Sequence, residues 1–235
     1  MWLRQVGTDR QAVKWSPMRL YHFTTAHYGL DNIDRRRLKI ATIPDLNDPY
    51  ELLCMDLSDK NFRWSMNAWK EHMGGVAGML CFSKDWHNPV QWSHYTDKHK
   101  GICLGFDIAD DTLFKVQYRD LRSSKEANRI VANQHGTLDD IRKVLSTKYK
   151  HWQYEQEYRV YVDLLDIDPV TKLHFTEFGP KMILREVIIG AKSNVERLQV
   201  AAVLRELDGK VDVRNARLGF KKYEVVTQQD QSLWK

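Results

Sequence analysis

Residues 152–162 read Trp152-Gln-Tyr-Glu-Gln-Glu-Tyr-Arg-Val-Tyr-Val162, and a helix is expected to give way to a strand within them. Side chains at i and i+2 of an extended chain point to one face, so Glu155 and Glu157 should lie side by side. Two adjacent carboxylates repel, which raises the pKa of one unless a cation or a ligand compensates. Arg159 lies on the same face and could supply that cation in a purely structural ion network. Alternatively, the pair projects into a cleft, where it stabilises a positive reacting centre or accepts protons.

Further elements are predicted on both sides of this stretch from apolar periodicity and turn residues. Besides 157–162, strands are expected at 18–24, 38–42, 76–83, 102–106, 115–118, 173–175, 186–189, 211–216 and 222–226. Helices are expected at 26–33, at 61–73 with Gly74 and Gly75 ending it, at 138–151 capped by Thr137, and from a capping box at Ser193 and Glu196 to before Gly209. Strands outnumber helices and alternate with them. The prediction is an α+β fold in a single domain, 1–235, with a mainly antiparallel sheet core and interspersed helices.

Composition narrows the class of protein. The chain has 235 residues, 43% hydrophobic and 29% charged, which is typical of a globular protein rather than a disordered or membrane protein. No apolar run is long enough to span a membrane, and charges interrupt the N-terminus where a signal peptide would be apolar. Three cysteines are too few for a disulfide scaffold. We expect a cytoplasmic protein without a membrane partner.

The charge is mildly basic, with a formal net charge of +5 and a pI near 9.0. This favours encounter with nucleic acid or anionic ligands without specifying either. One compact basic cluster is present, at Arg35, Arg36, Arg37 and Lys39. It is interpreted either as a solvated turn or as a set of nucleic-acid backbone contacts.

Metal and phosphate-loop chemistry is not indicated. Possible zinc ligands, Cys81, His87, His94, His99 and Cys103, lack the paired spacing of structural zinc sites. The glycines of 74–78 and 101–105 lack the Lys-Ser/Thr of a phosphate-binding loop and the setting of a dinucleotide fold. We therefore expect no metal and no hydride-transfer cofactor site.

Three other motifs carry polar side chains beside aromatic or turn residues. His22 lies in the middle of a predicted strand, where either a structural or a catalytic histidine would fit. Asn47-Asp-Pro-x-Glu51 forms a rigid loop that would suit either the rim of a cleft or an ordinary Asx turn. Trp92-Ser-His-Tyr95 combines large aromatic faces with hydrogen-bonding tips.

Taken in order, these pieces resemble a bacterial family catalogued as domain of unknown function 2971. The matching motifs are Leu20-Tyr-His-Phe-Thr24, Leu46-Asn-Asp-Pro-Tyr-Glu51, Leu80-Cys-Phe-Ser83, Trp92-Ser-His-Tyr95, Gly101-Ile-Cys-Leu-Gly-Phe106 and Trp152-Gln-Tyr-Glu-Gln-Glu-Tyr-Arg159. The resemblance covers roughly residues 18–226. It implies no activity by itself.

A more remote resemblance is to ADP-ribosyltransferases. Those enzymes carry a His-x-Thr motif on the first core strand, an aromatic-x-Ser or Tyr motif in mid-chain, and a Glu/Gln-x-Glu motif at the start of a later strand. Here His22-Phe-Thr24, Cys81-Phe-Ser83 and Glu155-Gln-Glu157 are similar to the three motifs, in the same order and at the same strand positions.

This second resemblance implies that NAD is consumed as a substrate and that ADP-ribose passes to an unknown macromolecule, protein or nucleic acid, in a toxin or phage-defence setting. Glu157 would be the main catalytic carboxylate, Glu155 would orient or deprotonate the acceptor, and His22 would complete the catalytic set. Residues expected to contact NAD are His22, Thr24, Ser83, Phe82, Tyr95 and Asn47. The alternative is a nucleic-acid-binding or partner-binding domain without catalysis.

Overall fold

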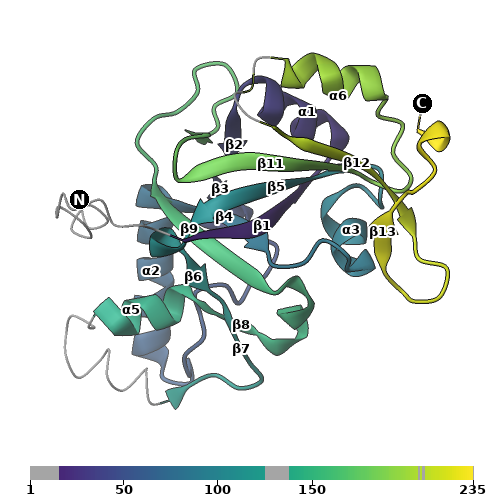
Figure 1. Ribbon diagram of the computed structural model, residues 1–235. Coiled ribbons are helices and arrows are strands. Elements are labelled where there is room, and N and C mark those ends of the chain that lie inside the picture. Colours follow the sequence, from purple (N-terminus) through teal and green to yellow (C-terminus); the bar gives the residue numbers. More distant parts are fainter. Residues whose placement is uncertain (1–15, 125–137, 206, 208–209, 235) are drawn as a thin grey trace.

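The strands β1 (Pro17–Thr24), β4 (Ala77–Ser83) and β5 (Ile102–Ala109) form the centre of a large sheet. A computed structural model describes residues 16–124, 138–205, 207 and 210–234. Within these residues one nine-stranded sheet has the order β13-β12-β11-β5-β1-β4-β9-β6, with β3 paired to β4 (Figure 1). All its pairs are antiparallel except β11 with β12. The expected α+β class with a mainly antiparallel sheet is confirmed.

The other strands of this sheet are β3 (Ala41–Thr42), β6 (Phe114–Lys115), β9 (Glu157–Asp163), β11 (Met182–Ile189), β12 (Asp212–Leu218) and β13 (Val225–Thr227). Two small sheets pair β2 (Arg37–Lys39) with β10 (Phe175–Glu177) and β7 (Gln117–Arg119) with β8 (Thr147–Tyr149). The α-helices are α1 (Ala26–Asp34), α2 (Lys60–Val76), α3 (Pro89–Tyr95), α5 (Leu138–Leu145) and α6 (Arg197–Leu204). Short 3-10 helices are η2 (Ile43–Asp45), η3 (Asp110–Thr112), η4 (Lys150–Glu155) and η5 (Gln231–Leu233). None of the helices in these described segments is long and apolar enough to cross a membrane.

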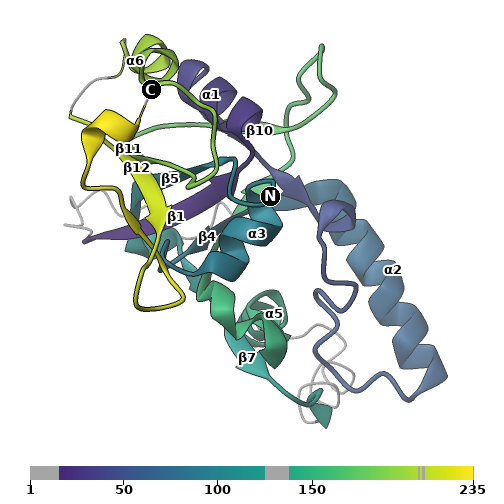
Figure 2. The ribbon, with the colours of Figure 1, turned by 90° about the vertical axis from the view of Figure 1, so that its right-hand side faces the viewer.

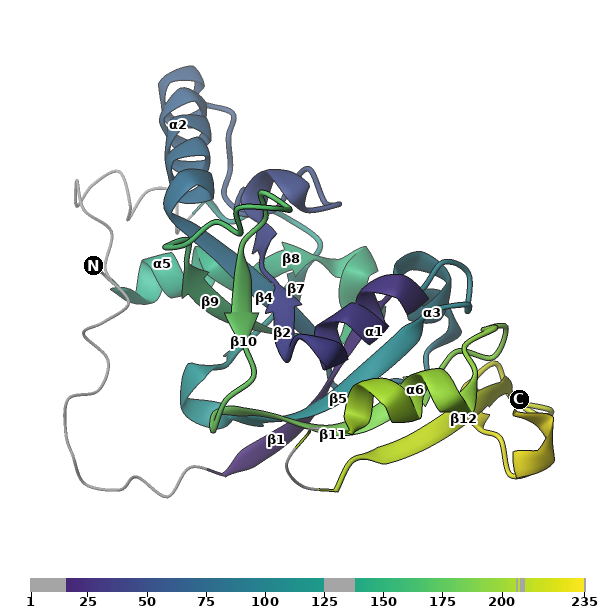
Figure 3. The same cartoon turned by 90° about the horizontal axis from the view of Figure 1, so that it is seen from above.

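The pleat of the sheet gives it two faces with different cover. On the first face, Leu20 of β1 lies opposite Phe106 of β5, and both belong to the largest hydrophobic cluster. Helices α1 and α6 cover this face, as the view from above shows (Figure 3), and they contribute Ile33 and Val200 to the cluster. Helices α2, α3 and α5 lie on the second face together with η4 (Figure 1). The candidate site lies on this second face.

The predicted helix 138–151 is wrong beyond residue 145. Helix α5 ends at Leu145, and the chain then forms β8 and η4. Thr147 explains part of the ending, because its hydroxyl donates to the carbonyl of Lys143 at 2.6 Å, and β8 then pairs in parallel with β7. The expected cap Thr137 lies outside the described residues. Lys148 therefore lies on an extended segment, in β8.

Other predicted boundaries shift by a few residues. Helix α2 passes through Gly74 and Gly75 to Val76, so these glycines do not end it. Helix α6 is capped by Glu196 with Gln199 in a capping box, so Ser193 is not the cap. Several strands move or divide: 38–42 becomes β2 and β3, 115–118 becomes β6 and β7, 173–175 becomes β10 and 222–226 becomes β13.

Candidate functional site

The predicted site residues of β1, His22 and Thr24, lie on the first face of the sheet, which α1 and α6 cover. His22 lies opposite Leu104 and Thr24 opposite Ile102, and both partners belong to the largest core cluster. The His22 ring packs edge-on against Phe82 with centroids 5.9 Å apart, and its Nδ1 lies 3.1 Å from the carbonyl of Cys81. Burial lowers the pKa of His22, so the ring is neutral at pH 7. His22, Thr24 and Phe82 therefore pack within the fold on the α1/α6 side.

Ser83 lies on the opposite, second face, where it is paired with Glu157 in the β4–β9 ladder. Its hydroxyl donates to the carbonyl of Asp85 at 2.8 Å and accepts from Gln91 Nε2 at 3.1 Å. Gln91 also donates to the carbonyl of Tyr154 at 3.1 Å. Ser83 therefore helps to hold α3 against the end of η4.

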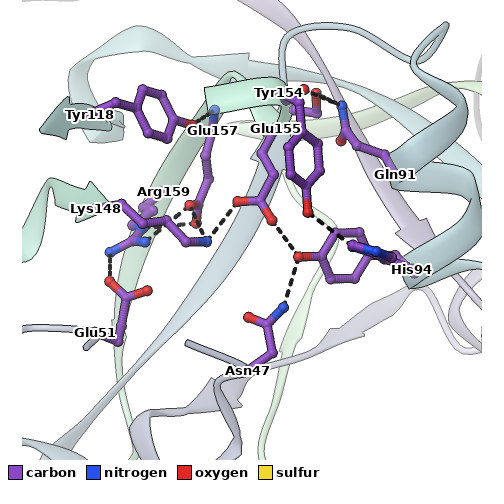
Figure 4. A network of polar contacts seen from close by, with 12 residues as sticks. Asn47, Glu51, Gln91, His94, Tyr118, Lys148, Tyr154, Glu155, Glu157 and Arg159 are labelled. Carbon is purple, nitrogen blue, oxygen red and sulfur yellow. Dashed lines mark hydrogen bonds and ion pairs between the residues drawn. The ribbon is translucent and has the colours of Figure 1, made fainter. Parts of the chain in front are cut away.

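Glu155 and Glu157 converge on one buried ammonium group (Figure 4). Lys148 Nζ donates to Glu155 Oε2 at 2.6 Å and to Glu157 Oε2 at 3.1 Å, and its side chain is only 5% exposed. The two carboxylates meet because Gln156 between them adopts a left-handed conformation, φ 45° and ψ 49°, which turns η4 into β9. Their proximity was predicted, but from an extended backbone, whereas Glu155 ends η4 and Gln156 is left-handed. Arg159, and not Lys148, was the compensating cation named from the sequence.

Arg159 fixes the inner carboxylate from the other side. Its Nε and Nη2 donate to the two oxygens of Glu157 at 2.8 and 3.0 Å, and its Nη1 donates to Glu51 Oε1 at 2.6 Å. Burial alone would raise the pKa of Glu157, but the charges of Arg159 and Lys148 outweigh it and hold that pKa below the ordinary value. Glu157 is thus ionised, and both of its carboxylate oxygens are paired. This agrees with the interpretation of Arg159 as the cation of a structural ion network.

Glu155 differs from Glu157 because its second hydrogen-bond partner, Tyr95, connects it to the protein surface. Tyr95 donates its hydroxyl hydrogen bond to Glu155 Oε1, and Asn47 Nδ2 donates to the Tyr95 hydroxyl at 3.0 Å. Asn47 is exposed. Burial raises the pKa of Glu155, and the nearby Glu157 adds to the effect against the opposing charge of Lys148. A carboxylate with a raised pKa and a hydrogen-bonded path to solvent suits proton transfer.

Aromatic rings surround this path. His94 Nδ1 lies 2.9 Å from the Tyr154 hydroxyl, within hydrogen-bond distance. The His94 ring also packs against Tyr95 and Trp152, with centroids 6.0 and 6.5 Å apart. Lys148 Nζ lies 5.0 Å from the centre of the Trp152 ring. The motif around Tyr95 and the one around Glu155 therefore meet in space.

A pocket of about 550 Å³ adjoins the ion network through Lys148. Its lining residues are Tyr50, Leu53, Cys54, Arg119, Asp120, Leu121, Arg122, Thr147, Lys148 and Tyr149. The Arg122 guanidinium lies 5.0 Å over the Tyr50 ring, and Asp120 is ion-paired with Lys150 at 2.8 Å. Three cationic side chains and two tyrosines give this pocket the lining that an anionic, ring-bearing ligand needs.

Sequence reasoning missed Lys148 and Tyr118 as members of the site. Tyr118 accepts a hydrogen bond from the backbone amide of Glu157 at 2.8 Å through its hydroxyl. Lys148 had one detectable signal: the adjacent carboxylates Glu155 and Glu157 called for a nearby cation, and Lys148 is a basic residue close to them in the sequence. The incorrect helix over 138–151 hid that candidate.

The basic cluster at 35–39 is largely neutralised. Arg35 pairs with Asp31 at 2.8 Å, Arg37 with Asp168 at 2.9 Å and Lys39 with Asp45 at 3.3 Å. These contacts favour the solvated-turn interpretation over a set of free phosphate contacts. Within the described residues, no three histidine, cysteine or carboxylate side chains gather as metal ligands.

Comparison with known proteins adds one match. Neither the curated proteins nor the solved structures gave a match to this chain. The segment 91–160, which carries Tyr95, Lys148, Glu155, Glu157 and Arg159, matches the family model described as "Protein of unknown function (DUF2971)".

Proposed function

We propose that this protein is an enzyme of the ADP-ribosyltransferase type, which takes NAD as a substrate and transfers ADP-ribose to an acceptor at a site centred on Glu155. One observation carries the proposal. The Glu155 carboxylate contacts Lys148, which lines the cationic pocket, and also Tyr95, which leads through Asn47 to the surface. The same group thus adjoins a place for an anionic substrate and a route for a proton.

The side chains that line the pocket match the phosphate groups and the aromatic rings of NAD. Arg119 and Arg122 offer charge-assisted donors for a pyrophosphate, and Tyr50 and Tyr149 offer ring faces for stacking. A dinucleotide carries two phosphates and two aromatic rings, so it uses both kinds of group.

The reaction would break the N-glycosidic bond between nicotinamide and ribose. Nicotinamide leaves with the bonding electron pair, and positive charge develops on the ribose as in glycoside hydrolysis. A negative carboxylate beside that charge stabilises the transition state more than the ground state. The acceptor then bonds to the anomeric carbon and gives its proton to Glu155, whose raised pKa makes it a stronger base than an ordinary glutamate.

The geometry favours Glu155 over Glu157 for this role. Both oxygens of Glu157 are bound by Arg159 and one of them also by Lys148, whereas one oxygen of Glu155 is bound by Tyr95, which leads through Asn47 to the surface. Glu157 is therefore assigned as a positioning residue that holds Lys148 in place. Asn47 and Tyr95 remain candidates for substrate contact because they connect Glu155 to the surface. The residues on the other face of the sheet, His22, Thr24 and Phe82, are assigned to packing.

Nicotinamide release tests the proposal. The full chain is incubated with NAD and, separately, with water alone, single-stranded oligonucleotides or a protein mixture as acceptor. Glu155→Gln should abolish release while leaving the thermal midpoint no lower than that of the wild type. His22→Asn, on the other face of the sheet, is the matched control and should retain release. Release unaffected by Glu155→Gln, or none from the wild type with any acceptor, would overturn the proposal.

A further inference from the structure

The β12–β13 hairpin ends in a tip, residues 218–224, that projects from the end of the large sheet (Figures 1 and 2). Its two aromatic side chains are almost uncovered: Phe220 is 89% exposed and Tyr223 is fully exposed. Lys221 and Lys222 lie between them in sequence. Large aromatic side chains usually bury most of their surface, so two exposed rings on one short turn mark an interaction site.

The tip is held in shape by its own backbone. Gly219 N donates to the carbonyl of Glu224 at 2.8 Å, and Glu224 N donates to the carbonyl of Lys222 at 2.9 Å. A side chain at Gly219 would meet the Lys222 carbonyl oxygen at 2.8 Å, so the turn needs a glycine there. At the base, Val225 is completely buried and its amide donates to the carbonyl of His87 at 2.8 Å. The exposed rings are thus presented on an ordered turn.

The charge of the tip is positive and not neutralised by its surroundings. Among the described residues, no acidic side chain forms an ion pair with Arg217, Lys221 or Lys222, in contrast to the cluster at 35–39. The Arg217 guanidinium lies 4.1 Å over the Phe220 ring, which holds a cation against one aromatic face. Glu224 is the one acidic residue in the segment 217–224.

We propose that this tip binds single-stranded nucleic acid, with Phe220 and Tyr223 stacking on bases and Arg217, Lys221 and Lys222 contacting phosphates. Unpaired bases expose faces for stacking, whereas duplex bases are already stacked on one another. A membrane fits less well, because inserting both rings would carry the two intervening ammonium groups into the apolar layer. The inference concerns binding alone and does not depend on the proposed catalysis.

Fluorescence anisotropy with labelled 12-nucleotide single strands of DNA and RNA tests this inference on the full chain without NAD. Phe220→Ala and Tyr223→Ala should each weaken binding about tenfold, the effect of losing one stacked base. Lys221→Ala with Lys222→Ala should make the salt dependence shallower by about 1.4 in the logarithmic slope. A duplex of the same sequence should bind several-fold more weakly.

Matched controls remove the same groups elsewhere. Trp64→Ala removes an exposed ring from α2, and Lys60→Ala with Lys115→Ala removes two exposed lysines. These controls should bind like the wild type. Equal affinity of the tip variants and the wild type would overturn the inference. So would loss of binding to anionic phosphatidylserine vesicles, with unchanged binding to the oligonucleotides, in the same tip variants.

Discussion

At the residue scale, Lys148 is the group on which the candidate site depends. It is the shared partner of two buried carboxylates that would otherwise repel each other. Three carboxylates, Glu51, Glu155 and Glu157, share two cations, Lys148 and Arg159. Removing one cation from such a network leaves charge buried without a partner, which costs far more than losing a surface ion pair.

We expect Lys148→Met to lower the free energy of unfolding by about 3–5 kcal/mol, because it leaves Glu155 and Glu157 without their shared cation. Urea unfolding followed by tryptophan fluorescence measures the change. Lys150→Met is the control: this neighbouring lysine is exposed and pairs with exposed Asp120, so its loss should leave the urea midpoint unchanged. Similar midpoints for the two variants would show that the buried network contributes no special stability.

The carboxylates themselves could be predicted from sequence, because their spacing and the adjacent strand are local features. Lys148 could not, because its role depends on where the chain leaves helix α5. The apolar stripe continues past residue 145, whereas the helix ends as Thr147 bonds back to Lys143 and β8 pairs with β7. His22 and Glu157 lie on opposite faces of the sheet. This placement depends on the register of the strands, because a shift by one residue moves a side chain to the other face.

At the element scale, the junction between η4 and β9 sets the direction of both carboxylates. Gln156 occupies the left-handed region, which is unfavourable for any side chain and most of all for a β-branched one. Its backbone is nonetheless held at both ends: its amide donates to the carbonyl of Gln153 at 3.2 Å, and its carbonyl accepts from Lys84 N at 3.1 Å. The strained conformation of Gln156 thus places the carboxylates of Glu155 and Glu157 within hydrogen-bond distance of Lys148.

Substitutions at Gln156 should report that strain directly. Gln156→Gly is expected to raise the free energy of unfolding by up to about 1 kcal/mol, and Gln156→Val to lower it by about 1–2 kcal/mol. Urea unfolding measures both variants, with Gln153→Val, three residues earlier and also exposed, as the control for adding a β-branched side chain. The prediction fails if Gln156→Val is no less stable than Gln153→Val.

At the scale of the whole molecule, the two faces of the sheet have different contents. The α1/α6 face holds the largest apolar cluster, and the other face holds the buried ion network, the pocket and the aromatic rings. The network joins Glu51 to the consecutive elements β8, η4 and β9, and its longest link, from Glu51 to Arg159, spans 108 residues. Protonating one of its carboxylates therefore changes the stability of the entire fold, and the two glutamates should do so with opposite signs.

Glu157 has a folded-state pKa below its ordinary value of 4.5, so the stability it contributes is present above pH 4.5 and is lost as the pH falls below it. Glu155 has a raised folded-state pKa, so the folded state holds a proton longer than the unfolded state, and stability declines as the pH rises above 4.5. Each proton changes the slope of unfolding free energy against pH by at most about 1.4 kcal/mol per pH unit. Urea unfolding from pH 3 to pH 8 measures these slopes. In Glu157→Gln the free energy of unfolding should fall less steeply below pH 4.5, and in Glu155→Gln its decline above pH 4.5 should disappear. Equal slopes in both variants and the wild type would mean that the network does not control acid stability.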